Sequence, residues 1–180
     1  MSELRRTVHR AGPYYRVVAP DWIDPANTVY SKQRGGRWNP AGEFGALYLN
    51  ATVGVAAANA RAQHSGRAIK LFDLLPDARP ELVTFKIPKV DVLDACTADG
   101  MTALGFDNNF PYGVPWSTCQ AIARQAHEAG LPGIASRSNA EATVSTSVGE
   151  ELALFEEISP GEPRARRKFH EWYPDPIPGR

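Results

Sequence analysis

Two arginines occupy positions where a charged side chain needs either an ionic partner or a ligand. Arg16 lies inside the apolar run YYRVV, and Arg37 directly follows a pair of glycines. Arginine is suited to bidentate recognition of phosphate, and glycines let the backbone approach a ligand closely. Ion pairs with carboxylates such as Asp21 or Glu43 would satisfy the same side chains and are the more common arrangement. The residues alone therefore indicate either a local anion site or two structural ion pairs.

Aromatic and hydroxyl side chains could complete an anion site. Trp38 and Tyr48 offer flat faces that could stack on an aromatic ring, although each is more often a core residue. Ser117 follows Trp116 at the expected start of a helix. Its hydroxyl could cap that helix or face an anion together with backbone N–H groups. These side chains would suit a ligand that carries both phosphate and an aromatic ring.

The segments that must position these residues mix strand-like and helical patterns without a regular order. Residues 20–45 are rich in Pro, Gly, Asn and Asp and are expected to form a long loop, a kind of segment that is often functional. Thr52 suits the N-cap of an alanine-rich helix. The expected strands cover 14–19, 46–50, 81–88, 132–138, 142–148 and 151–158, and the expected helices cover about 52–64 and 116–130. This mixture predicts an α+β fold rather than a doubly wound sheet.

Length and composition indicate one globular domain over residues 1–180, ending in a basic, proline-rich tail at 159–180. The residues are 43% apolar and 22% charged, and the net charge is zero, so no global field favours nucleic acid or an anionic membrane. We expect no leader peptide and no membrane span, because the chain lacks a suitable apolar run. Cys96 and Cys119 lack metal-ligand spacing, and we expect no metal. These features are typical of a cytoplasmic protein.

Familiar catalytic motifs are absent from the sequence. The chain has no phosphate-binding glycine loop ending in Lys-Ser/Thr, no HExxH and no GxSxG. The basic run RARRK at 164–168 is more typical of a solvated face than of a nucleic-acid patch in a chain of zero net charge. We therefore expect no nucleic-acid partner, and any anion site must be built locally from a few arginines.

Several short motifs together resemble the RES-domain family, bacterial toxins usually encoded beside an Xre-type antitoxin. The most specific is GGRWNPAG at 35–42, whose arginine is followed eleven residues later by a tyrosine in an expected strand. The supporting motifs are YYR at 14–16, LYL at 47–49, WSTCQA at 116–121 and GIASRS at 133–138. The last of these is similar to a late GxxxxS segment in many members. The resemblance covers about residues 12–157, which we take as the core of the domain.

The resemblance implies a fold similar to that of ADP-ribosyltransferases, with mixed or antiparallel sheets and flanking helices. It implies NAD as the substrate, which the members degrade or use to transfer ADP-ribose. It also implies a cognate Xre-type antitoxin that covers the pocket, and it leaves self-association open. We therefore expect cleavage of the nicotinamide–ribose bond, with water, phosphate or a protein side chain as acceptor.

The resemblance also assigns roles to individual residues. Arg16 and Arg37 would hold the NAD phosphates, and Tyr48 would stack against the nicotinamide or its ribose. Ser117 would lie in the same pocket, with Ser136 as the rival candidate for the family serine. The implied catalytic residues are Arg37, Tyr48, Asn59 and Ser117, and the implied NAD-binding residues are Arg16, Gly36, Arg37, Trp38, Tyr48, Ser117 and Ser136.

One position departs from the family pattern. The resemblance places a glutamate on the helix after the LYL strand, eleven residues beyond Tyr48, and this chain has Asn59 there. Asparagine can hydrogen-bond ribose hydroxyls but supplies no negative charge. Cleavage of the nicotinamide–ribose bond passes through an oxocarbenium-like state, as in glycoside cleavage. Losing a carboxylate beside that state can cost ~100-fold or more in rate.

Three interpretations of Asn59 stay open. The chain could be a member with reduced or altered activity that uses Asn59 for binding or recruits a carboxylate from elsewhere, such as Asp107 or Glu141. It could be a catalytically silent nucleotide-binding or protein-interaction module with the same fold. It could also be an inactivated form of an active parent. The first interpretation predicts loss of NAD over time, and the second predicts binding without turnover.

Overall fold

The computed structural model of the protein describes residues 6–140 and 149–174, which mix strands and helices without regular βαβ alternation. This architecture confirms the predicted α+β class. The strands are β1 (Thr7–Val18), β2 (Ala46–Asn50), β3 (Glu81–Ala95), β4 (Gly133–Arg137), β5 (Glu150–Phe155) and β6 (Pro163–Arg167). The helices are α1 (Val29–Arg34), α2 (Val53–His64), α3 (Ala98–Ala103), α4 (Trp116–Glu128) and α5 (Phe169–Trp172), with short 3-10 turns η1 (Leu71–Asp73) and η2 (Pro76–Ala78).

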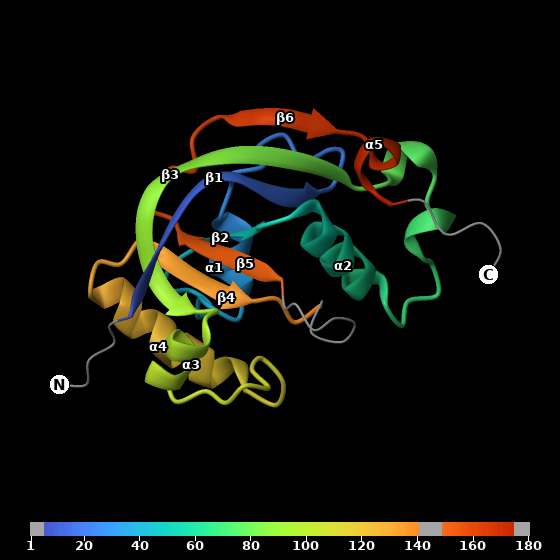
Figure 1. Cartoon of the computed structure of the whole chain (residues 1–180). Coiled ribbons are helices and arrows are strands. Elements are labelled where there is room, and N and C mark those ends of the chain that lie inside the picture. The colour runs from blue at the N-terminus through green and yellow to red at the C-terminus, as the bar shows by residue number, and fades with distance from the viewer. Residues whose placement is uncertain (1–5, 141–148, 175–180) are drawn as a thin grey trace.

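The strands form one mixed sheet that rolls up on itself. Their order is β1-β2-β5-β4-β3-β6, and β1 also pairs along β3. The long strand β3 makes this closure possible because it curves strongly (Figure 1). Its first half pairs antiparallel with β6, and its last residues, Leu93–Ala95, pair parallel with β4. β5 lies between β2 and β4 and is antiparallel to both.

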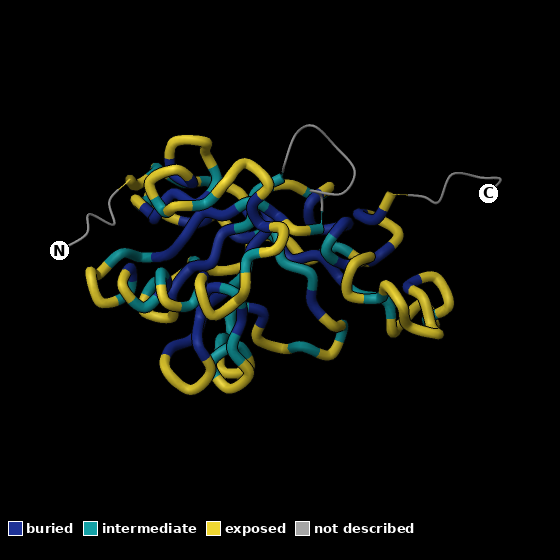
Figure 2. Tube along the Cα trace, turned by 90° about the horizontal axis from the view of Figure 1, so that it is seen from below, coloured by how far each residue is buried: buried dark blue, intermediate teal, exposed yellow. Residues whose placement is uncertain are grey.

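Side-chain alternation along β2 separates two faces of the rolled sheet. Leu47 and Leu49 join the inner apolar cluster, which β1 and β3 cover from the other side. Ala46 and Tyr48 point outward to a second cluster that is closed by α3 and α4. In Figure 2 the buried trace lies toward the middle of the molecule, and the exposed trace lies mainly at its periphery. On the outer face of β2, the side chain at the start of the strand therefore packs in the core, and the side chains toward the end of the strand are polar.

Helix α2 forms where the sequence predicted it. Its N-cap is Thr52, whose hydroxyl accepts a hydrogen bond from the Val55 N–H at 3.1 Å. Ala56, Ala57 and Ala60 are buried in a third cluster, and their small side chains let the helix pack closely. α2 thereby lies beneath the end of β1 and the start of β3, beside α5 (Figure 1).

The segment after residue 158, expected as a tail, contributes two elements to the fold. β6 extends the sheet next to β3, and α5 packs into the cluster formed around α2. Arg166 and Lys168 both pair with Glu81, whose side chain is 4% exposed. The basic run is largely exposed, as expected for a solvated face, and these two cations also pair with Glu81 because a buried carboxylate needs opposite charge nearby.

Several element boundaries differ from the sequence expectation. β1 starts at Thr7 rather than at residue 14, since its first half pairs with the curved end of β3. The expected loop at 20–45 contains α1, and β5 ends at Phe155 rather than at 158. The strand expected at 142–148 lies outside the described residues. Among the residues that are described, no helix is long and apolar enough to cross a membrane, and no three His, Cys, Asp or Glu side chains gather as metal ligands.

Candidate active site

A cleft of about 750 Å³ opens between the end of β1, the end of β2 and helix α2. Cations and neutral hydrogen-bonding groups dominate its polar lining. The polar lining side chains in the described part of the chain are Arg16, Trp22, Tyr30, Ser31, Tyr48, Asn50, Asn59, Gln63, His64, Arg67 and Glu151. Glu151 is the one acidic residue in this set. The cleft therefore offers positive charge, aromatic faces and a single carboxylate.

Tyr48 is held in the cleft wall by the glycine-containing loop before β2. Its hydroxyl accepts a hydrogen bond from the Trp38 N–H at 2.9 Å and donates one to Asn39 Oδ1 at 2.8 Å. A Cβ atom at Gly36 would lie 2.4 Å from the same hydroxyl, so this position requires glycine. Burial raises the pKa of Tyr48 well above its ordinary value, and the phenol stays protonated at neutral pH. The GGRWN segment thus fixes the position of the tyrosine.

Arg37 is a half-buried cation without a hydrogen-bond or ion-pair partner among the described residues. Its Nη1 atom is buried and makes no hydrogen bond with them. The expected ion pair with Glu43 does not form, because Glu43 pairs with Arg124 at 2.8 Å. Although Arg37 does not line the cleft itself, its charge acts on Tyr48, which does. A buried donor of this kind is costly unless something accepts its hydrogen bond.

Arg16 lines the cleft and also lacks a carboxylate partner within 4 Å in the described residues. Its Nη1 donates to the carbonyl oxygen of Pro25 at 2.5 Å, and its guanidinium lies 4.7 Å from the ring centroid of Trp22. Burial lowers the pKa of Arg16 to about 10, against the charge of Asp24. The expected ion pair with Asp21 is not formed, and Arg16 remains a cation held by neutral groups.

The side chain of Asn59 extends from α2 to one residue at the end of β2 and one near the start of β5. Its Nδ2 donates to Asn50 Oδ1 and to Glu151 Oε1, each at 2.7 Å. Glu151 Oε1 also accepts a hydrogen bond from Ser138 Oγ at 2.9 Å. The structure therefore brings Arg16, Tyr48 and Asn59 together in the cleft, as predicted, and adds Glu151 and Ser138 to them.

Other predicted site residues lie elsewhere. Trp38 is 1% exposed and packs against Phe110, so its ring is part of the core and does not offer a face to the cleft. Ser117 is exposed on α4, and the predicted N-cap role was wrong because α4 begins at Trp116 after Pro115. Ser136 is 1% exposed, and its hydroxyl donates to a backbone carbonyl.

The carboxylates expected to substitute for the family glutamate are not found in the cleft. Asp107 is exposed and accepts a hydrogen bond from the Asn109 N–H in its own loop. Glu141 lies outside the described residues. Sequence reasoning missed Glu151 because its position depends on the pairing of β5 with β2, across about a hundred residues of chain. For Ser138 a signal existed, since it is the last residue of the quoted GIASRS segment and shares a strand face with Ser136.

Comparison with known proteins decides the family. A family model for the RES domain matches residues 13–175. The chain belongs to the RES-domain family. The match confirms the resemblance drawn from the short motifs and extends it to α5, beyond the expected limit near residue 157.

This RES-domain protein also resembles individual proteins of known activity. It is 29% identical to NAD(+) phosphorylase MbcT from Mycobacterium bovis and from Mycobacterium tuberculosis, over 132 residues that make up 73% of this chain and 70% of the relative. Among solved structures, the M. tuberculosis MbcT–MbcA toxin–antitoxin complex superposes with a TM-score of 0.74 and 23% identity, covering 92% of this chain and 91% of the other. The superposition confirms the fold.

Proposed function

We propose that this RES-domain protein is a toxin that binds NAD in the cleft and cleaves the bond between nicotinamide and ribose. The observation that carries the proposal is the buried Nη1 of Arg37, which has no acceptor among the described residues and whose charge acts on Tyr48 in the cleft wall. The relative MbcT is named as an NAD(+) phosphorylase, which supports the substrate and favours inorganic phosphate over water or protein as the acceptor.

The charges of the cleft suit a dinucleotide. Arg16 supplies guanidinium donors from the cleft wall, and Arg37, which does not line the cleft, adds positive charge that acts on Tyr48. Neither arginine is neutralised by a carboxylate within 4 Å in the described residues. Tyr48 supplies a partly exposed aromatic edge in a fixed orientation for the nicotinamide or its ribose. Rigid binding of the pyrophosphate lets the protein use binding energy to hold the scissile bond in place.

An antitoxin partner is part of the proposal. The structural relative is a complex of a toxin with an antitoxin, and a protein that consumes NAD needs such control in its own cell. We propose an Xre-type antitoxin that covers the cleft. The aromatic side chain of Tyr30 at the cleft, which is 61% exposed, is available for such a contact. A bound antitoxin would then compete with NAD.

One observation favours a second candidate function. Asn59 stands where the family resemblance expects glutamate, and a chain without that charge would bind NAD without cleaving it. This alternative, a silent nucleotide-binding module, keeps the same cleft and the same arginines. The two candidates differ only in turnover.

The test is to incubate the purified protein with NAD, with and without inorganic phosphate, and to quantify released nicotinamide and the phosphorus-containing products by chromatography. We expect nicotinamide release that is faster with phosphate. Binding measured by calorimetry without nicotinamide release would favour the silent module. A folded protein that neither binds nor cleaves NAD would contradict both.

A matched pair of variants tests the role of Arg37. Arg37→Ala should weaken NAD binding by about 10–150-fold, corresponding to about 1.5–3 kcal/mol for a charge-assisted contact to phosphate. Arg164→Ala removes the same charge from the exposed strand β6 and should leave NAD affinity unchanged. Equal affinity of a folded Arg37→Ala variant and the parent would show that the phosphates bind elsewhere.

A further inference from the structure

We propose that Glu151 is the catalytic carboxylate of this cleft and that Asn59 and Ser138 position it. The inference rests on the proposed cleavage of NAD and goes beyond it by assigning the negative charge that the reaction needs. Glu151 is the single acidic side chain among the described residues that line the cleft.

The sheet register directs Glu151 toward the cleft. In the pairing of β2 with β5, Asn50 is opposite Glu151 and Tyr48 is opposite Ala153. Residues directly opposite each other in an antiparallel pair point to the same face, and so do residues two apart on one strand. Glu151 therefore shares a face with Tyr48 and Asn50, and all three line the cleft.

The hydrogen bonds to Glu151 hold it without neutralising it. Oε1 accepts from Asn59 Nδ2 at 2.7 Å and from Ser138 Oγ at 2.9 Å, and both donors are uncharged. Within the described residues, Oε2 makes no hydrogen bond and no Lys, Arg or His nitrogen lies within 4 Å of the carboxylate. The negative charge is thus fixed in direction, and one oxygen is free to face a ligand.

Asn59 is suited to positioning rather than to chemistry. Its Nδ2 donates to both Asn50 Oδ1 and Glu151 Oε1, so its two amide hydrogens are already used. The position at which the family resemblance expects a carboxylate therefore lies one hydrogen bond away from a carboxylate on another element. The charge is retained in the cleft and comes from β5 instead of α2.

The reaction uses this charge as follows. The bond between the anomeric carbon of the ribose and the nicotinamide nitrogen breaks, and its electron pair leaves with the nitrogen, which changes from a cationic pyridinium to neutral nicotinamide. The positive charge then lies on the ribose, in an oxocarbenium-like state beside Glu151. An anionic phosphate oxygen donates an electron pair to the anomeric carbon and completes the transfer. Glu151 forms no bond and stabilises the cationic state electrostatically.

Three variants test the assignment by steady-state nicotinamide release. Glu151→Gln keeps the shape and one acceptor oxygen for Asn59 and Ser138 and removes the charge, and kcat should fall by ~100-fold or more with little change in KM. Asp107→Asn removes an exposed carboxylate outside the cleft and should leave kcat unchanged. The double variant Asn59→Glu with Glu151→Asn exchanges the two partners of one hydrogen bond, and it should recover activity to within about 10-fold of the parent.

The outcomes separate this proposal from the proposed function. If the parent and Glu151→Gln release nicotinamide at the same rate, NAD cleavage stands and the role of Glu151 is overturned. The role is also overturned if Asp107→Asn loses activity while Glu151→Gln keeps it. If the parent is inactive and Asn59→Glu alone creates activity, the cleft is correct and Glu151 is not its carboxylate. If calorimetry detects no NAD binding to the folded parent, the proposed function itself fails.

Discussion

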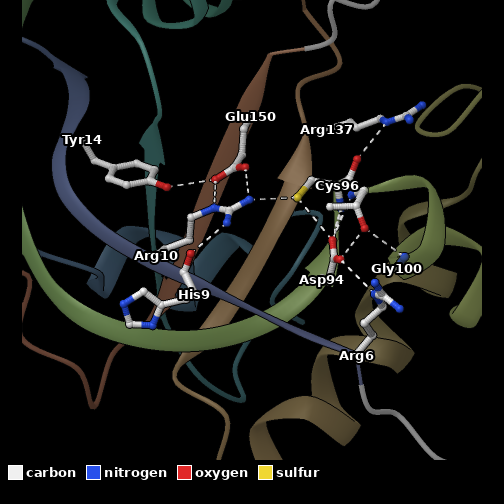
Figure 3. A network of polar contacts seen from close by, with 10 residues as sticks. Arg6, His9, Arg10, Tyr14, Asp94, Cys96, Gly100, Arg137 and Glu150 are labelled. Carbon is white, nitrogen blue, oxygen red and sulfur yellow. Dashed lines mark hydrogen bonds and ion pairs between the residues drawn. The ribbon is translucent and has the colours of Figure 1, made fainter.

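Two neighbouring glutamates on β5 face opposite sides of the sheet and have opposite surroundings. Glu150 points to the β1 side, where Arg10 donates to it twice, at 2.7 Å and 2.6 Å, and the Tyr14 hydroxyl donates at 2.9 Å (Figure 3). Glu151 points into the cleft and receives hydrogen bonds only from uncharged donors within the described residues. One carboxylate is neutralised and the other is not.

The difference shows how to separate a structural carboxylate from a functional one. The pair of Arg10 and Glu150 is about one-fifth exposed on each side and joins two strands far apart in sequence. The two charges neutralise each other, so the pair can hold the strands together but exerts little electrostatic attraction on a ligand. The charge of Glu151 is available, and so are the charges of Arg16 and Arg37. The cleft wall therefore carries one cation and one carboxylate, Arg16 and Glu151, that have no ionic partner within 4 Å among the described residues.

The largest expected effect on stability comes from breaking the compensated pair. Arg10→Met leaves Glu150 half-buried without its cation and should destabilise the protein by about 2–3 kcal/mol, less than for a fully buried pair because solvent reaches it. Urea unfolding measures this change. NAD affinity and turnover per folded molecule should be unchanged in Arg10→Met. Glu151→Gln should instead lower kcat and leave the free energy of unfolding within about 1 kcal/mol of the parent. If both variants lowered the free energy of unfolding equally, the distinction between a structural and a functional carboxylate would be wrong.

A smaller effect is expected from crowding the tyrosine on the cleft side. In Gly36→Ala the new methyl group would meet the Tyr48 hydroxyl, which must move, and the cost should be about 1–3 kcal/mol in unfolding free energy. Because Tyr48 lines the cleft, NAD affinity measured by calorimetry should fall as well. Gly113→Ala at an open turn provides a control for the loss of a glycine, with strain from its positive φ but no change in NAD affinity. Normal NAD affinity of Gly36→Ala would contradict the role given to this loop.

Removing the hydroxyl of Tyr48 should lower the free energy of unfolding by about 1–2 kcal/mol. Tyr48→Phe keeps the aromatic face but leaves the Trp38 N–H and Asn39 Oδ1 without their shared partner. We expect a lower urea midpoint and a modest loss of NAD affinity compared with Gly36→Ala. A larger loss of affinity in Tyr48→Phe than in Gly36→Ala would mean that the hydroxyl contacts the ligand directly.

The smallest change in stability is expected from Glu81, a third carboxylate that, like Glu150, is paired with cations. Burial raises the pKa of Glu81, but Lys168 and Arg166 more than offset this, and the net pKa lies below its ordinary value of 4.5. Its contribution to stability is therefore present above pH 4.5 and is lost as the pH falls through the folded-state pKa. The urea midpoint of the parent should drop on acidification below pH 4.5, and that of Glu81→Gln should drop less. Parallel acid dependences would show that Glu81 does not contribute.

Local patterns in the sequence predicted the helices and strands whose formation depends mainly on residues close to one another in the chain. Helix α2 lies where periodicity and its Thr52 cap placed it, and helix α4 and strand β2 lie where periodicity placed them, although the predicted Ser117 cap of α4 was wrong. The GGRWNP motif contacts Tyr48 through the Trp38 N–H and Asn39 Oδ1, and the NAD-binding role given to Tyr48 stays a prediction. Trp38 was assigned to the ligand but belongs to the core, since its indole packs on Phe110, a residue whose position no local pattern reveals.

The contacts missed by sequence reasoning are long-range. Glu151 meets Asn59 only because β5 pairs with β2 and α2 folds back over their ends, and neither event has a signal within a short window of sequence. The curvature of β3 and the pairing of β6 are of the same kind. In contrast, the departure of position 59 from the pattern that the resemblance implies was visible in the sequence. Asn59 lies one hydrogen bond from Glu151, the carboxylate that we propose supplies the charge.

The most direct test of the account is a crystal structure with a non-cleavable carbocyclic analogue of NAD. We expect the pyrophosphate within hydrogen-bonding distance of the guanidinium of Arg37, and the carbocycle that replaces the nicotinamide ribose beside the Glu151 carboxylate. An analogue bound outside the cleft would contradict the proposed function. An analogue in the cleft whose carbocycle lies away from Glu151 would contradict the assignment of that glutamate.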